Sequence, residues 1–399
     1  MRRRTGPWLR AARGLRSEIR GWREALHRRP ELSNEETGTQ RFVVDALDEL
    51  GIPHRTFPRF TGVLGEIRTD AGGPVVAIRA DMDALPVTEA TGVPFGSEVP
   101  GRMHACGHDV HMAALLGAAA LLHQRRRTLP GTVKLLFQPA EEEGETGGAA
   151  PFLERGAFDE PAVDFVVGQH VAPELPVGTI GWRKGAMYAA ADRFTVRVRG
   201  RGAHAAYPHL ARDPIVAASE IVVGLQTLVS RRTSPTDPVV VSVGMFHGGT
   251  RHNILPDEVM LEGTVRTLSP TTRDDLERLV RERIAGIARS QGVRATVAYR
   301  RGYPPTVNPA PATELVVEAL TEEFGAPAVR EVTEPSMGAE DFSHFLERVP
   351  GTFLKLGAGR PGETASLHSA RFAPPEETAV VGAATLACAA VALQRRGAP

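Results

Sequence analysis

Met103-His104-Ala105-Cys106-Gly107-His108-Asp109-Val110-His111 is the stretch of this chain that most constrains its fold and chemistry. Three histidines, a cysteine and an aspartate lie together there, immediately before an apolar run over residues 112–122. A thiolate and an imidazole two positions apart can bind one divalent cation, and Gly107 lets the main chain bend between them. A lone histidine is more often an ordinary loop residue, but this density predicts metal binding. The apolar run predicts a helix over residues 109–123.

The segments around this stretch have the pattern of an α/β protein whose strands end in polar residues. Strands are predicted over residues 63–68, 75–79, 132–137 and 165–167. Asp81 and Asp83 follow the second strand, Glu141–Glu143 the third, and His170 the fourth. The carboxyl ends of parallel strands meet at one edge, where α/β folds place their chemistry, and buried acids there are costly unless paired. A solvated acidic run would explain Glu141–Glu143 alone, but not the whole collection.

Two helices are expected before the first of these strands. The first has the apolar face Leu15, Ile19, Trp22 and Leu26. The second is expected to begin at a cap formed by Ser33 or Asn34 and to end at Gly51. Residues 1–30 hold ten arginines against two glutamates, and no apolar run of signal-peptide length follows. An arginine-rich transit segment would fit this composition, but we favour a tail that leads into the first helix.

Composition excludes several classes of protein. The 399 residues carry 47 basic and 47 acidic side chains, so no basic field predicts nucleic-acid binding. Only two cysteines occur, Cys106 and Cys388, which indicates no disulfide framework and predicts a cytoplasmic protein. No window approaches the ~18–20 apolar residues of a membrane span, so no membrane association is expected.

The second half of the chain begins with a different pattern. Strand, helix, strand, strand, helix and strand are predicted over residues 192–199, 213–230, 238–246, 258–268, 271–291 and 293–299. The order βαββαβ is that of a ferredoxin-like module. A helix over 313–324, a strand over 353–356 and an alanine-rich last helix follow. We therefore expect a first domain, residues 1–186 and 304–399, with a central, mostly parallel sheet flanked by helices, interrupted by the module at 187–303.

Several motifs resemble those of the metal-dependent aminoacylase and carboxypeptidase superfamily, and most closely its N-acyl-amino-acid amidohydrolase branch, which includes hippurate hydrolases and auxin-conjugate hydrolases. The match covers nearly the whole chain. It rests on Leu26–Ser33 (LHRRPELS), Arg79–Pro86 (RADMDALP), His104–Asp109 (HACGHD), Phe137–Glu142 (FQPAEE) and Met337–Phe342 (MGAEDF). The number and order of these motifs, more than any one of them, carry the resemblance.

The resemblance implies a site that binds two divalent metal ions, Zn, Mn or Co. The implied metal ligands are Cys106, His108, Glu142, His170 and His368. Glu141 is implied as the general base, since a bound divalent ion brings the pKa of a water to about 7 and a nearby carboxylate can then move its proton.

The resemblance also assigns residues around this site. Other branches of the superfamily carry His-x-Asp where this chain has Asp81 and Asp83, so whether Asp81 binds metal is open. Asp83 is expected to orient a ligand histidine. His204 belongs to a segment similar to the family's lid motif, where it would stabilise the oxyanion, reaching it from a partner subunit. Asn253 and Arg266 match positions that contact substrate, and Arg266 would bind a carboxylate.

The sequence thus predicts a cytoplasmic metallo-amidohydrolase that cleaves N-acyl amino acids or small conjugates and forms a homodimer through the inserted module. A carboxypeptidase or dipeptidase using the same site is the nearest alternative. A thiol hydrolase with Cys106 as nucleophile is an alternative from another chemistry. An inactive metal-binding protein is a third, but a structural site would not need Glu141 beside its ligands.

Overall fold

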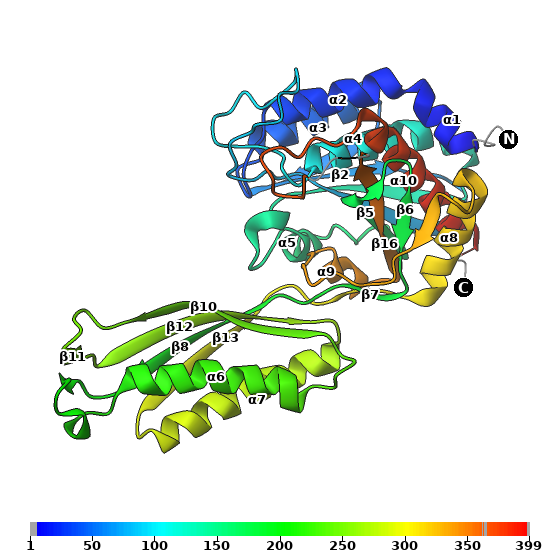
Figure 1. Ribbon diagram of the computed structural model, residues 1–399. Coiled ribbons are helices and arrows are strands. Elements are labelled where there is room, and N and C mark those ends of the chain that lie inside the picture. The colour runs from blue at the N-terminus through cyan, green and yellow to red at the C-terminus, as the bar shows by residue number, and fades with distance from the viewer. Residues whose placement is uncertain (1–5, 361, 363–364, 397–399) are drawn as a thin grey trace. The chain divides into compact units, whose positions relative to one another are not determined.

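The computed structural model describes residues 6–360, 362 and 365–396, and the chain divides into two compact units (Figure 1). Unit 1 comprises Met1–Gly185, Val307–Glu334 and Asp341–Pro399, and unit 2 comprises Ala186–Thr306 and Pro335–Glu340. Of the arginine-rich N-terminus that was expected to form a tail, the first five residues lie outside the described residues, and Pro7–Gly14 is a helix, so the expectation was wrong for that part.

Unit 1 is built on an eight-stranded, mostly parallel sheet. Its strands are β1 (His54–Phe57), β2 (Phe60–Ile67), β3 (Gly73–Asp81), β4 (Gly131–Gln138), β5 (Phe165–Pro176), β6 (Ile180–Trp182), β15 (Val329–Glu331) and β16 (Gly351–Gly359). Their order is β1-β2-β4-β3-β5-β16-β6-β15, and the central strands β4, β3, β5 and β16 are parallel neighbours. This sheet confirms the predicted α/β fold. The short strands β1, β6 and β15 were not predicted.

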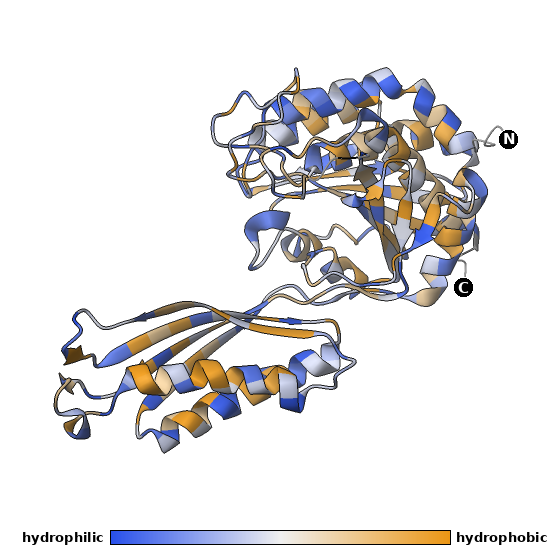
Figure 2. Ribbon diagram, in the orientation of Figure 1, coloured by the Kyte–Doolittle hydropathy of each residue, from blue (hydrophilic) through white to orange (hydrophobic). Residues whose placement is uncertain are grey.

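Helices cover both faces of the sheet. They are α1 (Pro7–Gly14), α2 (Arg16–Arg28), α3 (Thr37–Glu49), α4 (His108–Gln124), α5 (Ala149–Glu154), α8 (Ala310–Phe324), α9 (Ser343–Leu346) and α10 (Glu376–Arg396). α4 and α10 pack against each other and on β3 and β5. Gly382 of α10 lies against Gln169 of β5, whereas Phe342, just before α9, lies against Gly168 on the opposite face. In Figure 2 the central strands are largely apolar and α2 is largely hydrophilic.

One helix of the described residues, α10, is long and apolar enough to cross a membrane by length and composition alone. The expectation that no such window exists was therefore wrong. Of this window, 89% is buried inside the structure, as in the core helix of a folded domain. The helix is alanine-rich, and its small side chains let it pack closely on α4 and the sheet.

Two local predictions were also wrong. α3 begins at Thr37 with Glu36 at the N-cap position and no side-chain cap, so neither Ser33 nor Asn34 caps it, and the Ser33 hydroxyl donates to Asp83 Oδ2. The fourth predicted strand does not end at Val167 but continues as β5 to Pro176. Glycine normally weakens a strand, but a Cβ at Gly168 would lie 2.6 Å from the Phe342 ring, so close packing requires glycine there.

Unit 2 contains the ferredoxin-like module. Its elements are β8 (Asp192–Arg199), β9 (Ala203–His204), α6 (Pro214–Arg232), β10 (Val239–Gly248), β11 (Ile254–Leu255), β12 (Glu258–Thr267), α7 (Pro270–Ser290) and β13 (Arg294–Arg301). The four long strands form an antiparallel sheet in the order β10-β12-β8-β13, and α6 and α7 pack on it and on each other. β9 and β11 form a separate two-stranded sheet. β7 (Gly185–Tyr188) and β14 (Thr306–Asn308) each include a point at which the chain passes from one unit to the other.

Candidate metal centre

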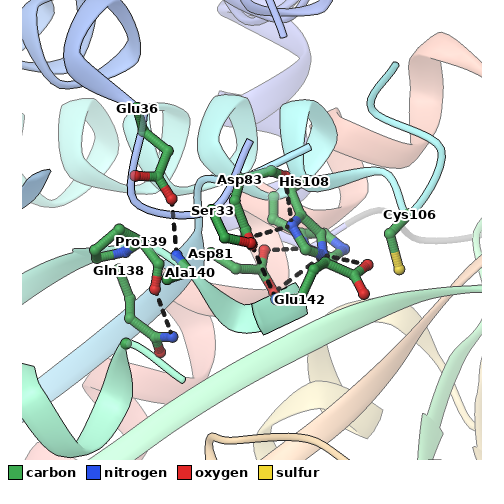
Figure 3. A network of polar contacts seen from close by, with 12 residues as sticks. Ser33, Glu36, Asp81, Asp83, Cys106, His108, Gln138, Pro139, Ala140 and Glu142 are labelled. Carbon is green, nitrogen blue, oxygen red and sulfur yellow. Dashed lines mark hydrogen bonds and ion pairs between the residues drawn. The ribbon is translucent and has the colours of Figure 1, made fainter. Parts of the chain in front are cut away.

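The candidate site lies at the carboxyl-terminal edge of the parallel strands of unit 1. β3 ends at Asp81, β4 leads into a 3-10 turn formed by Glu141–Glu143, and β5 carries His170. Asp81 of β3 pairs with Gln138 of β4, so both strands deliver their next residues to the same place. Cys106 and His108, around the start of α4, face the same turn in Figure 3. The edge thus collects the acids and histidines as predicted.

The structure brings together all five residues expected to bind metal. Ligand atoms of Cys106, Glu142 and His368 lie within 4.8 Å of one another. His108 Nε2 lies 4.0 Å from Glu142 Oε1, and His170 Nε2 lies 3.3 Å from Cys106 Sγ. The five side chains therefore form one connected cluster.

Three residues of the site have main-chain conformations in the left-handed region. Gly107, between Cys106 and His108, has φ 81°, and a Cβ there would lie 2.7 Å from Val171. Ala140 and His368 adopt φ 56° and 63° although neither is glycine. Such conformations cost about 1–3 kcal/mol each and persist where surrounding contacts hold them. The contacts around Ala140 and His368 therefore offset the free-energy cost of these main-chain conformations.

Main-chain hydrogen bonds fix the orientation of two of the histidines. His108 Nδ1 donates to the carbonyl of Asp83 at 2.8 Å, and His170 Nδ1 donates to the carbonyl of Val171 at 2.8 Å. When such a ring is neutral, as a metal ligand must be, its lone pair is consequently on Nε2, the atom that faces the cluster. His108 Nε2 is buried and makes no hydrogen bond to the described residues. A buried nitrogen without such a bond is costly unless a ligand takes that place.

The carboxylate of Asp83 lies against His108, as expected for a residue that orients this ring. The hydrogen bond from His108, however, goes to the main-chain carbonyl of Asp83. Its carboxylate Oδ1 lies 3.2 Å from His108 Nδ1. Its Oδ2 accepts from the Ser33 hydroxyl at 2.7 Å and from the main-chain N–H of Glu142 at 2.9 Å. Asp83 therefore links the start of α4 to the turn that carries Glu142.

Asp81, whose role the sequence left open, is engaged on both oxygens. Its Oδ1 accepts from His111 Nδ1 at 2.6 Å, and its Oδ2 accepts from Arg79 Nη1 at 2.8 Å. His111 Nε2 in turn accepts the main-chain N–H of Val171 at 2.9 Å. Asp81 and His111 thus support the main chain beside His170. No role was predicted for His111, although its position one helical turn after His108 places it on the same face of α4.

The charges around the cluster favour a bound cation. Burial raises the pKa of Cys106 well above its usual value, and the carboxylates of Glu142 and Glu141 raise it further. Burial also acts to raise the pKa of Glu142, but its hydrogen bond to His368 and the charge of His108 lower it overall. Burial lowers the pKa of His170 to about 3, so this imidazole is neutral, as a metal ligand must be.

The side chains present fit two divalent ions of the zinc, manganese or cobalt type. Three imidazoles, one carboxylate and one thiol form a mixed nitrogen, oxygen and sulfur set of the kind these ions accept. A divalent charge would reverse the electrostatic effect on Cys106, because a coordinating thiol is deprotonated. A thiol that acts as nucleophile needs a lowered pKa, and that of Cys106 is raised, which speaks against the thiol hydrolase.

The remaining predicted site residues lie in unit 2. His204 forms half of β9 and is exposed, and its Nδ1 accepts the main-chain N–H of Ala206 at 3.1 Å. Asn253 is also exposed, and its carbonyl accepts from Ala205 N at 3.1 Å, which places it beside His204. Arg266 is half-buried on β12. His204 and Asn253 are therefore neighbours, whereas Arg266 lies on the main sheet of the module.

Comparisons with known proteins agree with this geometry. The model of a protein family described as peptidase family M20/M25/M40 matches residues 77–392, a range that includes every candidate ligand. An N-acetyl-L-cysteine deacetylase from Bacillus subtilis (strain 168) is 43% identical over 345 residues, covering 86% of this chain and 81% of that protein. Thermostable carboxypeptidase 1 from Saccharolobus solfataricus is 38% identical over 382 residues, covering 94% of this chain and 96% of that protein. A solved Bacillus subtilis structure, described as a dinuclear metal binding peptidase from the M20 family, superposes with a TM-score of 0.84 at 36% identity, covering 96% of this chain and 99% of that one.

Proposed function

Because the chain belongs to peptidase family M20/M25/M40, we propose that this metallo-amidohydrolase cleaves the amide bond of N-acyl amino acids or small amino-acid conjugates. The observation that carries the proposal is the cluster of Cys106, His108, Glu142, His170 and His368 with Glu141 next to it. The deacetylase relative supports the substrate class, since its name describes removal of an acyl group from an amino acid.

Two divalent ions would be held by this cluster. Cys106, Glu142 and His368 form one group of ligand atoms, and His108 and His170 approach it through Nε2. When bound, such ions lower the pKa of a water to about 7 and polarise the scissile carbonyl. The structure described as dinuclear supports two ions in this chain. Zinc, manganese and cobalt all suit the ligand set.

Glu141 is the general base of the proposed reaction. It is 7% exposed, and a carboxylate oxygen of Glu141 lies within 4.8 Å of ligand atoms of His108 and Glu142. Glu141 takes a proton from the attacking water and returns it to the leaving nitrogen, so the carboxylate ends the cycle unchanged. Its neighbour Glu142 binds metal, and the 3-10 turn directs the two side chains to different tasks.

Unit 2 supplies the groups that contact the substrate. His204 stabilises the developing oxyanion from a partner subunit, and Asn253 beside it contacts the substrate. Arg266 binds the α-carboxylate through its guanidinium. The exposed position of His204 supports this role, because a group that acts on another subunit's substrate must be accessible in its own.

The active form is proposed to be a homodimer that assembles through unit 2. Of the eight large apolar side chains that are exposed in the described residues, seven lie in this unit. They are Tyr207, Leu210, Val216, Val223, Met245, Phe246 and Ile254. Met245 and Phe246 lie on β10, an edge strand whose unpaired main chain and apolar side chains suit pairing with a second copy. Both cysteines are free and buried, which supports a cytoplasmic protein.

A carboxypeptidase or dipeptidase activity at the same site is the second candidate, and the relative named as a thermostable carboxypeptidase favours it. Both reactions hydrolyse an amide beside a free carboxylate and differ in the group on the acyl side. Hippurate, N-acetyl amino acids including N-acetylcysteine, and dipeptides, each assayed with the zinc, manganese and cobalt forms, separate the two. Higher kcat/KM on N-acyl substrates supports the proposal. Higher kcat/KM on dipeptides contradicts it and supports the alternative.

A further inference from the structure

Glu36, immediately before α3, is a fully buried carboxylate outside the set of metal ligands. Its Oε1 accepts the main-chain N–H of Ala140 at 2.8 Å, and its Oε2 accepts the Thr61 hydroxyl at 2.6 Å. Figure 3 shows the first of these bonds reaching the turn that leads to Glu142. Burial raises the pKa of Glu36 to about 7, and the charge of Asp83 adds to the effect. The hydrogen bonds of Glu36 offset the free-energy cost of burying its carboxyl group.

Ala140, the residue that Glu36 holds, is strained. Its φ of 56° lies in the left-handed region, and it directly precedes the 3-10 turn Glu141–Glu143. A non-glycine residue keeps such a conformation only where its surroundings hold it there. The other anchor of the turn is the N–H of Glu142, which donates to Asp83, and Asp83 is held by Ser33. The segment from Ser33 to Glu36 therefore fixes the turn at two points.

We propose that Glu36 is a positioning residue, which holds Ala140 in its left-handed conformation so that Glu141 and Glu142 reach the substrate water and the metal. The side chains of Glu141 and Glu142 leave the main chain one and two residues after Ala140. Rotation about the Ala140 main chain would move both of them together. A displacement of about 1 Å at a reacting group can cost about 10²-fold in rate. This inference rests on the proposed roles of Glu141 and Glu142.

The test compares Glu36→Ala with Glu36→Gln in the cobalt-loaded protein. Alanine removes the acceptor for the Ala140 N–H, whereas glutamine keeps a carbonyl oxygen in the same place. We expect Glu36→Ala to lower kcat by about 10–10²-fold with KM within about threefold, and to change the visible absorption of bound cobalt because Glu142 shifts. Glu36→Gln should retain kcat within about threefold and the wild-type spectrum. If Glu36→Ala does not fold, Glu36→Met replaces it, since it fills the space without an acceptor.

Glu323→Ala is the matched control. Glu323 is also a buried glutamate that accepts a main-chain N–H, that of Leu9 at 2.8 Å, but it holds α1 and not the catalytic turn. Both alanine variants should lower the thermal midpoint, and only Glu36→Ala should change kcat and the cobalt spectrum. The proposal is overturned if Glu36→Ala leaves both unchanged, or if Glu36→Gln is as impaired as alanine. The spectrum needs no substrate, so it still decides the role of Glu36 if no N-acyl amino acid is hydrolysed.

Discussion

The metal-binding cluster of unit 1 and the His204 region of unit 2 differ in how firmly their functional side chains are held. His108 and His170 are buried and fixed by hydrogen bonds to main-chain carbonyls. His204 is exposed and lies on a strand of two residues, and its imidazole accepts the main-chain N–H of Ala206. His108 and His170 are therefore prearranged before any substrate arrives, and His368, although exposed, has its Nε2 3.2 Å from Glu142 Oε1. The exposed His204 on its short strand is not prearranged in this way.

This difference suggests a division of labour between the two units. In the proposed reaction, unit 1 holds the groups that bind metal and move a proton, and its hydrogen bonds spread from Ser33 to Val171. In the same proposal, unit 2 carries groups that contact the substrate only after it has bound. Substitutions in the first set should alter metal or chemistry, and substitutions in the second should alter turnover or substrate binding with the metal retained.

Glu141→Gln tests the proposed role of unit 1 in proton transfer and should have the largest effect on turnover. Glutamine fills the same space but cannot move a proton, so turnover should fall by about 10²–10⁴-fold. Metal content by mass spectrometry should stay near wild type, because Glu141 is not one of the proposed ligands. Metal retained with activity within tenfold of wild type would remove Glu141 as the base.

His204→Ala tests the proposed role of unit 2 in stabilising the oxyanion. Loss of an oxyanion donor should lower turnover by about 10²–10³-fold, while metal content and dimerisation stay unchanged. Mixing this variant with Glu141→Gln should restore activity, because one site of each heterodimer pairs an intact Glu141 with an intact His204 from the other chain. About half of the wild-type rate per dimer is expected if the two sites act independently. No gain after verified subunit exchange would show that His204 does not act across a dimer.

Cys106→Ser should act on metal binding more than on any single chemical step. A serine hydroxyl stays protonated near neutral pH, whereas a metal-bound thiol is ionised, so affinity for cobalt or zinc should fall. The cobalt form should also lose its sulfur-to-metal absorption band. Tight metal binding equal to that of the parent would show that Cys106 is not a ligand.

Arg266→Lys should have the smallest effect of the four. Lysine keeps the charge but loses the two-pronged geometry that matches a carboxylate, so KM should rise by about tenfold with little change in kcat. Steady-state kinetics on an N-acyl amino acid and on its amide, which lacks the carboxylate charge, measure the effect. The account predicts that the variant loses more with the carboxylate than with the amide, and an equal loss on both contradicts it.

Much of the fold and the cluster could be predicted from sequence because the signals are local or repeated. The strands before Asp81 and Glu141 are β-branched and apolar, and parallel strands must end at one edge, so their polar residues could be placed together. The βαββαβ order of unit 2 was similarly evident, because each element has clear periodicity.

The errors arose where a distant residue decides a local structure. Ser33 was expected to cap a helix, but the helix begins only at Thr37, and the Ser33 hydroxyl donates to Asp83, fifty positions away. Gly168 was expected to end a strand, but Phe342 requires a glycine at that point. Whether Asp81 is free to bind metal depends on its hydrogen bonds with Arg79 and His111. The geometry of these bonds cannot be predicted from the spacing of the residues in the sequence.

The most direct test of the account is hydrolysis of N-acyl amino acids as a function of bound metal. Protein is stripped with a chelator, cobalt is added back in steps, and metal per chain and initial rate are measured on the same samples. The account predicts negligible activity in the stripped protein and a rate that rises until two ions are bound per chain. Full activity with less than about a tenth of an ion per chain would contradict it and restore the thiol hydrolase, with Cys106 as nucleophile, as the better explanation.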